Sequence, residues 1–214
     1  MARLRFNISL SLDGFTAGPD QSLDHPLGVG GDRLHDWVVP LAAWREPHGM
    51  EGGEKSESSQ VVRENVSNIG ATIMGRNMFG GHPGPWDRDE PWQGWWGENP
   101  PFHHPVFVIT KHAREPLELE GGTTFTFVTG GIEEALERAL AAADGRDVSL
   151  GGGANVAQQY LAAGLIDEME LHLVPVLLGS GERLFAGVGD DLHGLRLVRT
   201  IAAENVVHLR FAKR

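Results

Sequence analysis

Three consecutive glycines are the feature of this sequence that points most directly to chemistry. Gly151, Gly152 and Gly153 follow the apolar run V-S-L and precede residues 154–163, whose pattern predicts a helix. Glycines between a buried strand and a helix let a ligand approach the backbone, and free amides at the helix start favour a phosphate. A tight turn that merely needs glycine accounts for the same residues, so this segment leaves both interpretations open. It is not the dinucleotide fingerprint G-x-G-x-x-G, because position 156 is valine.

Cations follow two other predicted strands. The run I-M-G-R-N-M-F places Arg76 directly after Gly75, and V-I-T-K-H places Thr110 and Lys111 at the end of an apolar strand. A guanidinium can clamp a phosphate with two hydrogen bonds, although an isolated arginine at a strand end is more often simply solvated. In open α/β sheets, groups beyond the carboxyl ends of the strands converge on the ligand crevice. Three such strand ends favour a dinucleotide that carries an additional phosphate.

Composition narrows the possible chemistry. The chain has 214 residues, no cysteine and a formal net charge of -11. Without cysteine there are no disulfides, thiolate nucleophiles or cysteine-zinc sites, so chemistry must come from carboxylates, histidines, hydroxyls or a cofactor. The negative charge argues against nucleic-acid or anionic-membrane partners. No signal-peptide-like start and no run near 18 apolar residues occur, so we expect a soluble, cytoplasmic protein.

The elements that would position these residues alternate between strands and helices. We expect one α/β domain over residues 1–214, with a mostly parallel sheet and an antiparallel C-terminal hairpin turning at Glu204-Asn205. The expected strands cover residues 3–11, 71–75, 105–110, 124–128, 147–150, 168–175, 195–203 and 206–212. The expected helices cover residues 32–45, 58–68 (with Ser58 or Ser59 as N-cap), 132–143 and 154–163. Residues 20–60 and 80–105 hold much of the glycine, proline and tryptophan and are expected to be long insertions.

The order of motifs resembles the dihydrofolate-reductase-like family, and more closely its branch that contains the reductase domain of the riboflavin-biosynthesis deaminase-reductase. The motifs that carry the resemblance are S-L-D-G-F (11–15), M-G-R-N-M-F (74–79), V-I-T-K (108–111), L-G-G-G-A-N-V-A-Q-Q-Y-L (150–161) and P-V-L-L-G-S-G (175–181). Each motif is weak alone, but together they cover nearly the whole chain in the family's order. The resemblance implies a dihydrofolate-reductase-like fold and an NADPH-dependent reductase.

The resemblance also implies a cofactor site, residue by residue. Gly151, Gly152, Gly153, Ala154 and Asn155 would face the pyrophosphate of NADPH. Gly75, Arg76 and Asn77 would lie near the adenosine ribose and its phosphates, and Thr110 and Lys111 would border the 2′-phosphate. The family's substrate would be a pterin-like or ribosylaminopyrimidine-like heterocycle that accepts a hydride at a C=N bond or its ribosyl equivalent. The zinc-deaminase signature H-x-E with P-C-x-x-C is absent, so this chain would lack the deaminase activity.

Two carboxylates are candidates for handling the substrate. Asp13, after the first strand, is the best candidate for a group that orients substrate or relays a proton, although Asp-Gly is also an ordinary turn. Asp36 is its rival, because folate-specific members of the family place a carboxylate on the first helix. The Leu-Pro-Trp approach to that helix is missing here, which weakens the case for dihydrofolate itself.

The tryptophan-rich loop (residues 80–105) allows several interpretations. Trp92 and Trp95 would stack on a flat heterocycle, or they would instead bury the loop or a protein contact. His103-His104 lacks useful spacing for a metal, and we expect no metal site. The resemblance suggests a homodimer, for which P-V-L-L-G-S-G and the terminal hairpin would supply apolar area. A catalytically silent NADP(H)-binding protein and a protein-binding scaffold remain alternatives to the enzyme.

Overall fold

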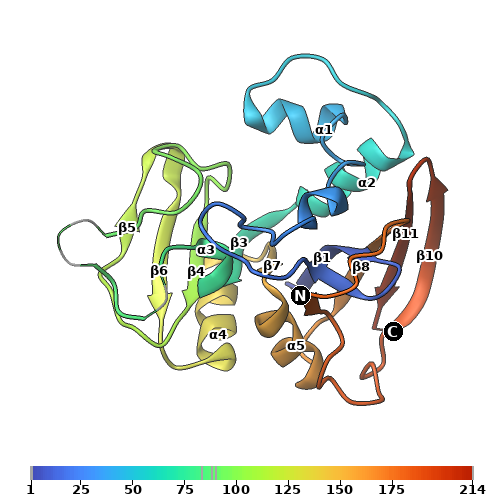
Figure 1. Cartoon of the computed structure of the whole chain (residues 1–214). Coiled ribbons are helices and arrows are strands. Elements are labelled where there is room, and N and C mark those ends of the chain that lie inside the picture. The colour runs from blue at the N-terminus through green and yellow to red at the C-terminus, as the bar shows by residue number, and fades with distance from the viewer. Residues whose placement is uncertain (1, 83, 88, 90, 214) are drawn as a thin grey trace.

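A mixed sheet of nine strands forms the centre of the part of the chain that the computed structural model describes, residues 2–82, 84–87, 89 and 91–213. The strand order is β10-β11-β8-β1-β7-β3-β4-β6-β5 (Figure 1). The bounds are β1 (Leu4–Ser11), β3 (Ile69–Gly75), β4 (Pro105–Ile109), β5 (Leu117–Glu118), β6 (Thr124–Val128), β7 (Asp147–Gly152), β8 (Glu168–Val174), β10 (Arg196–Ala203) and β11 (Val206–Ala212). The six strands from β8 to β6 run parallel, whereas β5, β10 and β11 pair antiparallel. The expected sheet with its C-terminal hairpin is confirmed.

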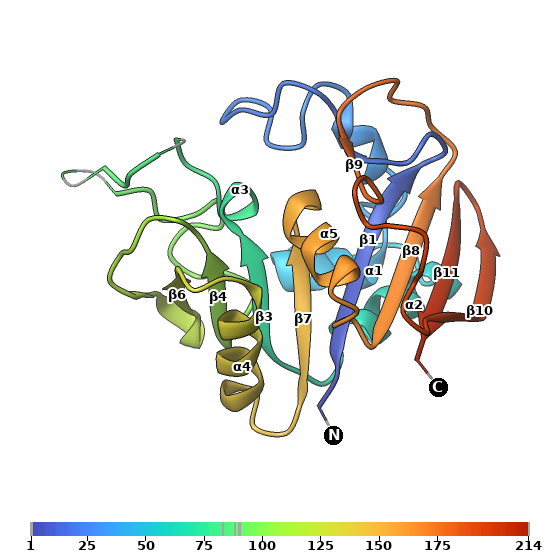
Figure 2. The ribbon, with the colours of Figure 1, turned by 90° about the horizontal axis from the view of Figure 1, so that it is seen from below.

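Helices cover both faces of this sheet (Figures 1 and 2). α4 (Ile132–Ala142) and α5 (Ala154–Ala162) lie on one face, and α1 (Ala42–Arg45) and α2 (Glu57–Val66) lie on the other. The central strand β1 is therefore buried on both sides: Phe6 belongs to the main apolar core, while Ser9 accepts a hydrogen bond from the indole of Trp37 at 3.1 Å. No helix in the described part of the chain is both long and apolar enough to cross a membrane.

The remaining elements are short. They are β2 (Phe15–Ala17), β9 (Glu182–Arg183), α3 (Arg76–Phe79) and the 3-10 turns η1 (Gly31–Leu34), η2 (Glu46–His48) and η3 (Glu120–Gly122). β2 and β9 pair antiparallel as a small second sheet beyond the end of β1.

The single helix expected over residues 32–45 is wrong. The chain forms η1, a series of turns, α1 and then η2, because Pro40 lacks an amide hydrogen and disfavours helical geometry at Val39. The apolar spacing still predicted burial correctly. Leu34, Trp37, Val38 and Leu41 form a buried cluster with Val174 of β8 and Val206 of β11.

The N-cap expected at Ser58 or Ser59 is also wrong. Ser56 caps α2, because its hydroxyl accepts a hydrogen bond from the Ser59 amide at 3.3 Å. The two expected serines turn inward instead: Ser58 bonds His208 at 3.0 Å, and Ser59 accepts from the Ala43 amide at 3.3 Å. The side chains of Ser58 and Ser59 therefore make tertiary hydrogen bonds and do not cap the helix.

Candidate functional site

The segments predicted to bind a cofactor meet at one edge of the sheet. β1, β7, β3 and β4 are parallel neighbours, and their carboxyl ends lead into Asp13, Gly153, Arg76 and Thr110 respectively. The loops that follow these strands gather at the upper edge in Figure 2. The topology therefore brings these four positions to one edge, as expected for an open α/β sheet.

The two glycine motifs of this edge contact each other. In the register of β3 with β7, Met74 lies opposite Gly152. A Cβ atom added to Gly75 would lie 2.7 Å from Cγ2 of Val156 and 3.6 Å from both the Gly152 oxygen and the Gly153 nitrogen. A side chain at position 75 would force Val156 or α5 to shift, so glycine permits the close packing of this helix on the strand.

A space open to a ligand lies in front of the next two glycines. Cβ atoms added to Gly152 or Gly153 would meet no protein atom within 4 Å, and Gly152 has a φ of 109° that favours glycine. The peptide bond between them is cis. Gly153 is the N-cap of α5 and makes no side-chain cap, so the amides of Ala154 and Asn155 start a helix whose dipole favours an anion. These residues fit the pyrophosphate of a dinucleotide.

Arg76 lies beside the tryptophan-rich loop. Its Nη2 donates a hydrogen bond to the His82 carbonyl at 2.9 Å, and its Cζ atom lies 3.5 Å from the ring centroid of Trp86. Burial, followed by the nearby charge of Arg114, lowers the pKa of Arg76 to about 10, so the guanidinium remains charged at neutral pH. The neighbouring residue Asn77 is exposed.

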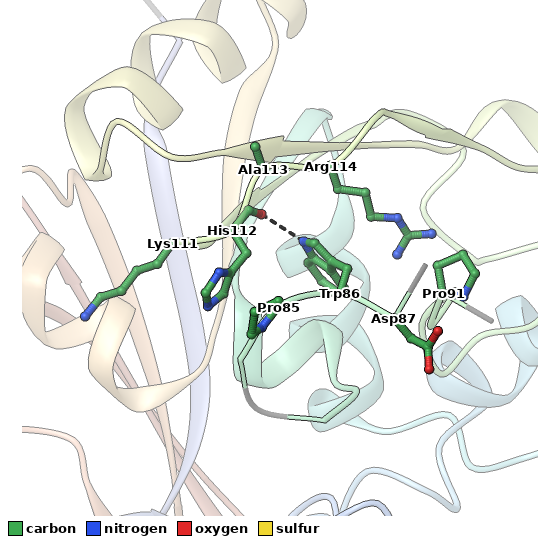
Figure 3. A pocket seen from close by; sticks show the side chains of 8 residues that line it. All are labelled: Pro85, Trp86, Asp87, Pro91, Lys111, His112, Ala113 and Arg114. Carbon is green, nitrogen blue, oxygen red and sulfur yellow. Dashed lines mark hydrogen bonds between the residues drawn. The ribbon is translucent and has the colours of Figure 1, made fainter. Parts of the chain in front are cut away.

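A pocket of about 500 Å³ adjoins this arginine (Figure 3). Its lining residues are Pro85, Trp86, Asp87, Pro91, Lys111, His112, Ala113 and Arg114. Lys111 is exposed and extends away from the indole, whereas Arg114 lies on the other side of Trp86. Thr110 is buried and accepts a hydrogen bond from the His112 amide at 3.2 Å, so its hydroxyl shapes the loop that carries these cations.

The tryptophans predicted to contact substrate are held by the protein backbone. The indole of Trp92 donates to the Phe79 carbonyl at 2.9 Å, and that of Trp95 donates to the Met78 carbonyl at 3.1 Å. Their rings meet edge to face with centroids 4.7 Å apart, and both are half-buried. Both tryptophans therefore pack the loop against α3, and a contact with substrate stays a prediction.

Asp13 binds a second loop instead of pointing freely into solvent. Its carboxylate accepts hydrogen bonds from the Ser11 hydroxyl at 2.6 Å and from the amides of Leu178 at 3.2 Å and Gly179 at 2.7 Å. These bonds, the Ser11 bond foremost, lower the pKa of Asp13 from 3.8 to about 2. Asp13 is therefore ionised at neutral pH, and its role in orienting substrate or relaying a proton stays a prediction. Asp36 is exposed on the turn after η1.

The comparisons with known proteins identify the family. The RibD C-terminal domain family matches residues 2–209. The chain belongs to this family. The Bacillus subtilis (strain 168) protein YyaP, which is named as uncharacterized, is 35% identical over 74 residues, or 35% of this chain and 38% of YyaP.

Solved structures of the RibD family share the fold. A Shewanella sp. PV-4 protein assigned to riboflavin biosynthesis aligns with 20% identity and a TM-score of 0.61 over 99% of both chains. The Thermotoga maritima diaminohydroxyphosphoribosylaminopyrimidine deaminase/5-amino-6-(5-phosphoribosylamino)uracil reductase aligns with 14% identity and a TM-score of 0.56, and RibD of Acinetobacter baumannii with 21% and 0.58. The alignments cover 100% and 99% of this chain but only 57% and 58% of those two proteins.

Some residues of this RibD-family site carried no recognisable signal in the sequence. Arg114 reaches Trp86 and Phe127 through tertiary contacts, and no local pattern marks it. The bond from the Ser11 hydroxyl to Asp13 was missed as well. His103 and His104 bond Gly121 and Thr72, and the described residues contain no group of three or more metal-ligating side chains.

Proposed function

We propose that this RibD-family chain is an NADPH-dependent reductase of a ribosylaminopyrimidine-like or pterin-like compound. The observation that carries the proposal is the convergence of Gly75 with the open Gly152-Gly153 turn at the start of α5, beside the cations that follow β3 and β4. The family membership supports a reductase, and the Thermotoga maritima relative is named as a reductase of 5-amino-6-(5-phosphoribosylamino)uracil. We propose that compound as the first substrate to test and dihydrofolate as the second.

The chain's own residues would divide the work of binding. The backbone of residues 152–155 would hold the pyrophosphate, and Arg76 with the cations after β4 would hold the phosphate on the adenosine side. When bound, NADPH supplies the hydride. Because the Asp13 carboxylate is ionised and accepts three hydrogen bonds, the proton that accompanies reduction would come from solvent or substrate, with Asp13 shaping the edge that positions the substrate.

Binding and turnover can be tested separately. NADPH titrated into the protein should change tryptophan fluorescence with a saturable dependence in the micromolar range, since six tryptophans are present. Loss of absorbance at 340 nm with each candidate substrate then measures reduction. Saturable binding without oxidation of NADPH by either compound would favour a silent NADP(H)-binding protein, and no binding would remove both cofactor proposals.

The scaffold alternative draws less support from the tryptophan-rich loop. The indoles of Trp86, Trp92 and Trp95 all donate to backbone carbonyls of this chain, which ties them inward.

A homodimer is also proposed, through exposed apolar side chains of the 175–181 segment and the terminal hairpin: Leu177 is 63% exposed and Leu197 is 52% exposed. Light scattering should give twice the chain mass of 23.2 kDa; a monomer across the micromolar range would contradict it.

A further inference from the structure

The tryptophan-rich loop brings two guanidinium groups to a single indole. Cζ of Arg76 lies 3.5 Å from the ring centroid of Trp86, and Cζ of Arg114 lies 5.1 Å from the same centroid. Arg114 also lies 4.9 Å from the ring centroid of Phe127. The two arginines follow different strands, β3 and β4, and Trp86 comes from the loop between them. The indole is thus the shared surface on which the two cations gather.

Trp86 is held firmly enough to serve as such a surface. Its indole nitrogen donates a hydrogen bond to the His112 carbonyl at 2.8 Å, which ties the loop to the segment after β4 (Figure 3). Its ring also packs against Phe79 and Phe127, with centroids 5.8 and 5.0 Å away. Both pairs are T-shaped, with interplanar angles of 81° and 68°, and the Arg76 guanidinium lies over the indole.

Neither guanidinium has a carboxylate partner among the residues that the structure describes, unlike Arg5 and Arg210. Among the described residues, their hydrogen bonds go to backbone carbonyls, from Arg76 to His82 and from Arg114 to Trp92, and no ion pair to either arginine is seen. Nε of Arg76 is buried without a hydrogen-bond partner. Burial lowers the pKa of both arginines, and each remains charged. Two cations that lie at one indole without a carboxylate partner among the described residues are stabilised by an anion.

The charge of this arrangement indicates which anion fits. A phosphate monoester carries close to two negative charges at neutral pH, whereas each phosphate of a pyrophosphate diester carries one. A stacked guanidinium keeps its in-plane N–H groups available for oxygen atoms. Lys111 and His112 line the adjoining pocket together with Asp87 and Arg114. The cations therefore suit a phosphate monoester better than a neutral group.

We propose that Trp86 is a positioning residue that holds Arg76 and Arg114 as one receptor for a phosphate monoester. The tryptophan-rich loop would then set the preference of this protein for a phosphorylated dinucleotide over its unphosphorylated form. This inference rests on the proposed NADPH site and adds to it two residues, Trp86 and Arg114, that act through the loop.

The decisive experiment compares dissociation constants for NADPH, NADH and adenosine 2′,5′-bisphosphate by fluorescence or calorimetry. Arg114→Ala should weaken NADPH and the bisphosphate roughly 10- to 100-fold and leave NADH within about twofold, because only the monoester contact is lost. Trp86→Leu should weaken NADPH about tenfold with NADH again unchanged. Trp86→Phe keeps an aromatic face and should retain most of the selectivity. The variant that combines Trp86→Leu with Arg114→Ala should weaken NADPH by less than the product of the two single fold-changes, because both substitutions disrupt the same phosphate contact.

Two matched controls separate this role from general loosening of the loop or a change of net charge. Trp96→Leu makes the same substitution in the same loop, where the ring packs on Phe102 and Phe125. Arg138→Ala removes a cation on α4 that pairs with Glu134. Both controls should leave the NADPH-to-NADH ratio unchanged.

The outcomes distinguish failure of this inference from failure of the proposed NADPH site. If the unaltered protein prefers NADPH but Trp86→Leu and Arg114→Ala keep that ratio, this inference is overturned and the proposed function stands. Equal weakening of NADPH and NADH would show that Trp86 only supports the loop, which also overturns it. If neither dinucleotide binds the unaltered protein, the proposed function itself fails. Should Trp86→Leu not fold, Arg114→Ala and Trp86→Phe still decide the question.

Discussion

Six of the arginines occupy two contrasting settings, one group towards the β10 edge of the sheet and the other towards its β5 edge. On the side of β1, β8, β11 and β10, carboxylates surround them: Arg3, Arg5, Arg199 and Arg210 pair with Glu64, Asp147, Glu168 and Glu170. On the side of β3 and β4, Arg76 and Arg114 rest on an aromatic ring. Ion pairs hold the first group in place, whereas the second group has no carboxylate partner among the residues that the structure describes. Matched arginines therefore contribute to stability, and the unmatched ones are available to a ligand.

Glu170 is the central carboxylate of the matched side. Its side chain is 2% exposed and accepts hydrogen bonds from Arg210 at 2.6 Å and Arg199 at 3.2 Å. Glu64 of α2 contacts the same two arginines at 3.2 and 2.7 Å. The network thus ties α2 to the C-terminal hairpin.

The largest effect should follow from breaking this network. Glu170→Ala would remove the most buried carboxylate of the network and leave Arg199 and Arg210 with Glu64, and it should lower the free energy of unfolding by about 3 kcal/mol, measured by urea denaturation. NADPH binding to the folded fraction should not change. The matched control is Glu134→Ala in the exposed pair with Arg138, which should cost about 0.5 kcal/mol or less. Equal effects of the two variants would contradict the distinction between the buried and exposed pairs.

A buried histidine pair lies on the same side of the sheet. His172 of β8 and His208 of β11 are cross-strand partners whose Nδ1 atoms are 2.8 Å apart. Asn65 accepts from Arg210 through Oδ1, so its Nδ2 donates to Nε2 of His172. His172 must then donate from Nδ1 to His208, which in turn donates from Nε2 to Ser58. Both histidines are neutral in this chain of bonds, and a proton on either would break it.

Acid should therefore destabilise this side of the molecule. Burial, followed by His208, lowers the pKa of His172 from 6.5 to about 3, and burial lowers the pKa of His208 and His35 as well. Between pH 6.5 and 3 the unfolded chain binds protons that the folded chain does not, so stability is complete above pH 6.5 and falls below it. At pH 4.5 the linkage through His172 should lower the free energy of unfolding by about 2 to 3 kcal/mol.

Denaturation profiles at several pH values measure this loss. His172→Gln should flatten the profile between pH 6.5 and 4.5, although it lowers stability at neutral pH. His193→Gln, at an exposed histidine beside Asp191, should leave the slope as it is. A slope that is independent of His172 would place the acid sensitivity elsewhere.

Substitutions on the unmatched side should change the affinity for NADPH and have little effect on the free energy of unfolding. Arg76→Ala removes a half-buried cation that lacks a carboxylate partner in the described residues, so it should change the free energy of unfolding by less than about 1 kcal/mol. It should weaken NADPH by about 2 kcal/mol relative to NADH, because a charge-assisted contact with the 2′-phosphate is lost. Equal weakening of NADPH and NADH would show that Arg76 does not contact that phosphate.

Local patterns predicted the sheet well because strand periodicity and helix spacing follow directly from burial. The run 124–128 became β6 with the expected bounds, and 132–143 became α4 with one residue fewer. The pattern around 32–45 predicted which side chains are buried but not the backbone, because a proline outweighed the spacing. The strand-end motifs could be placed at one edge from topology alone, since parallel neighbours share an edge.

What the sequence could not show depends on contacts between distant segments. Nothing near Arg114 indicates that an indole 28 positions earlier lies beside it, and nothing near Asp13 indicates that the amides of Leu178 and Gly179 bind its carboxylate. The tryptophan-rich loop has no regular periodicity, so its path is set by individual indole-to-carbonyl bonds. Contacts between segments that are far apart in the sequence thus distinguish the paired from the unpaired arginines, and they can be seen only in the folded chain.

Asp13 follows β1 and is bonded by the loop after β8, both on the matched side, and the smallest predicted effect tests whether its carboxylate acts in turnover. Asp13→Asn keeps one acceptor oxygen for the loop amides but removes the charge, and it should lower kcat about tenfold through looser positioning while the Kd for NADPH stays the same. Because the pKa of Asp13 is lowered to about 2, its contribution is complete above pH 3.8 and is lost only as the pH falls through 2. The ratio of kcat between the unaltered protein and the variant should therefore be constant from pH 5 to 8. A ratio that rises or falls with pH in that range would mean that Asp13 exchanges a proton during turnover; unchanged turnover would remove Asp13 from the reaction altogether.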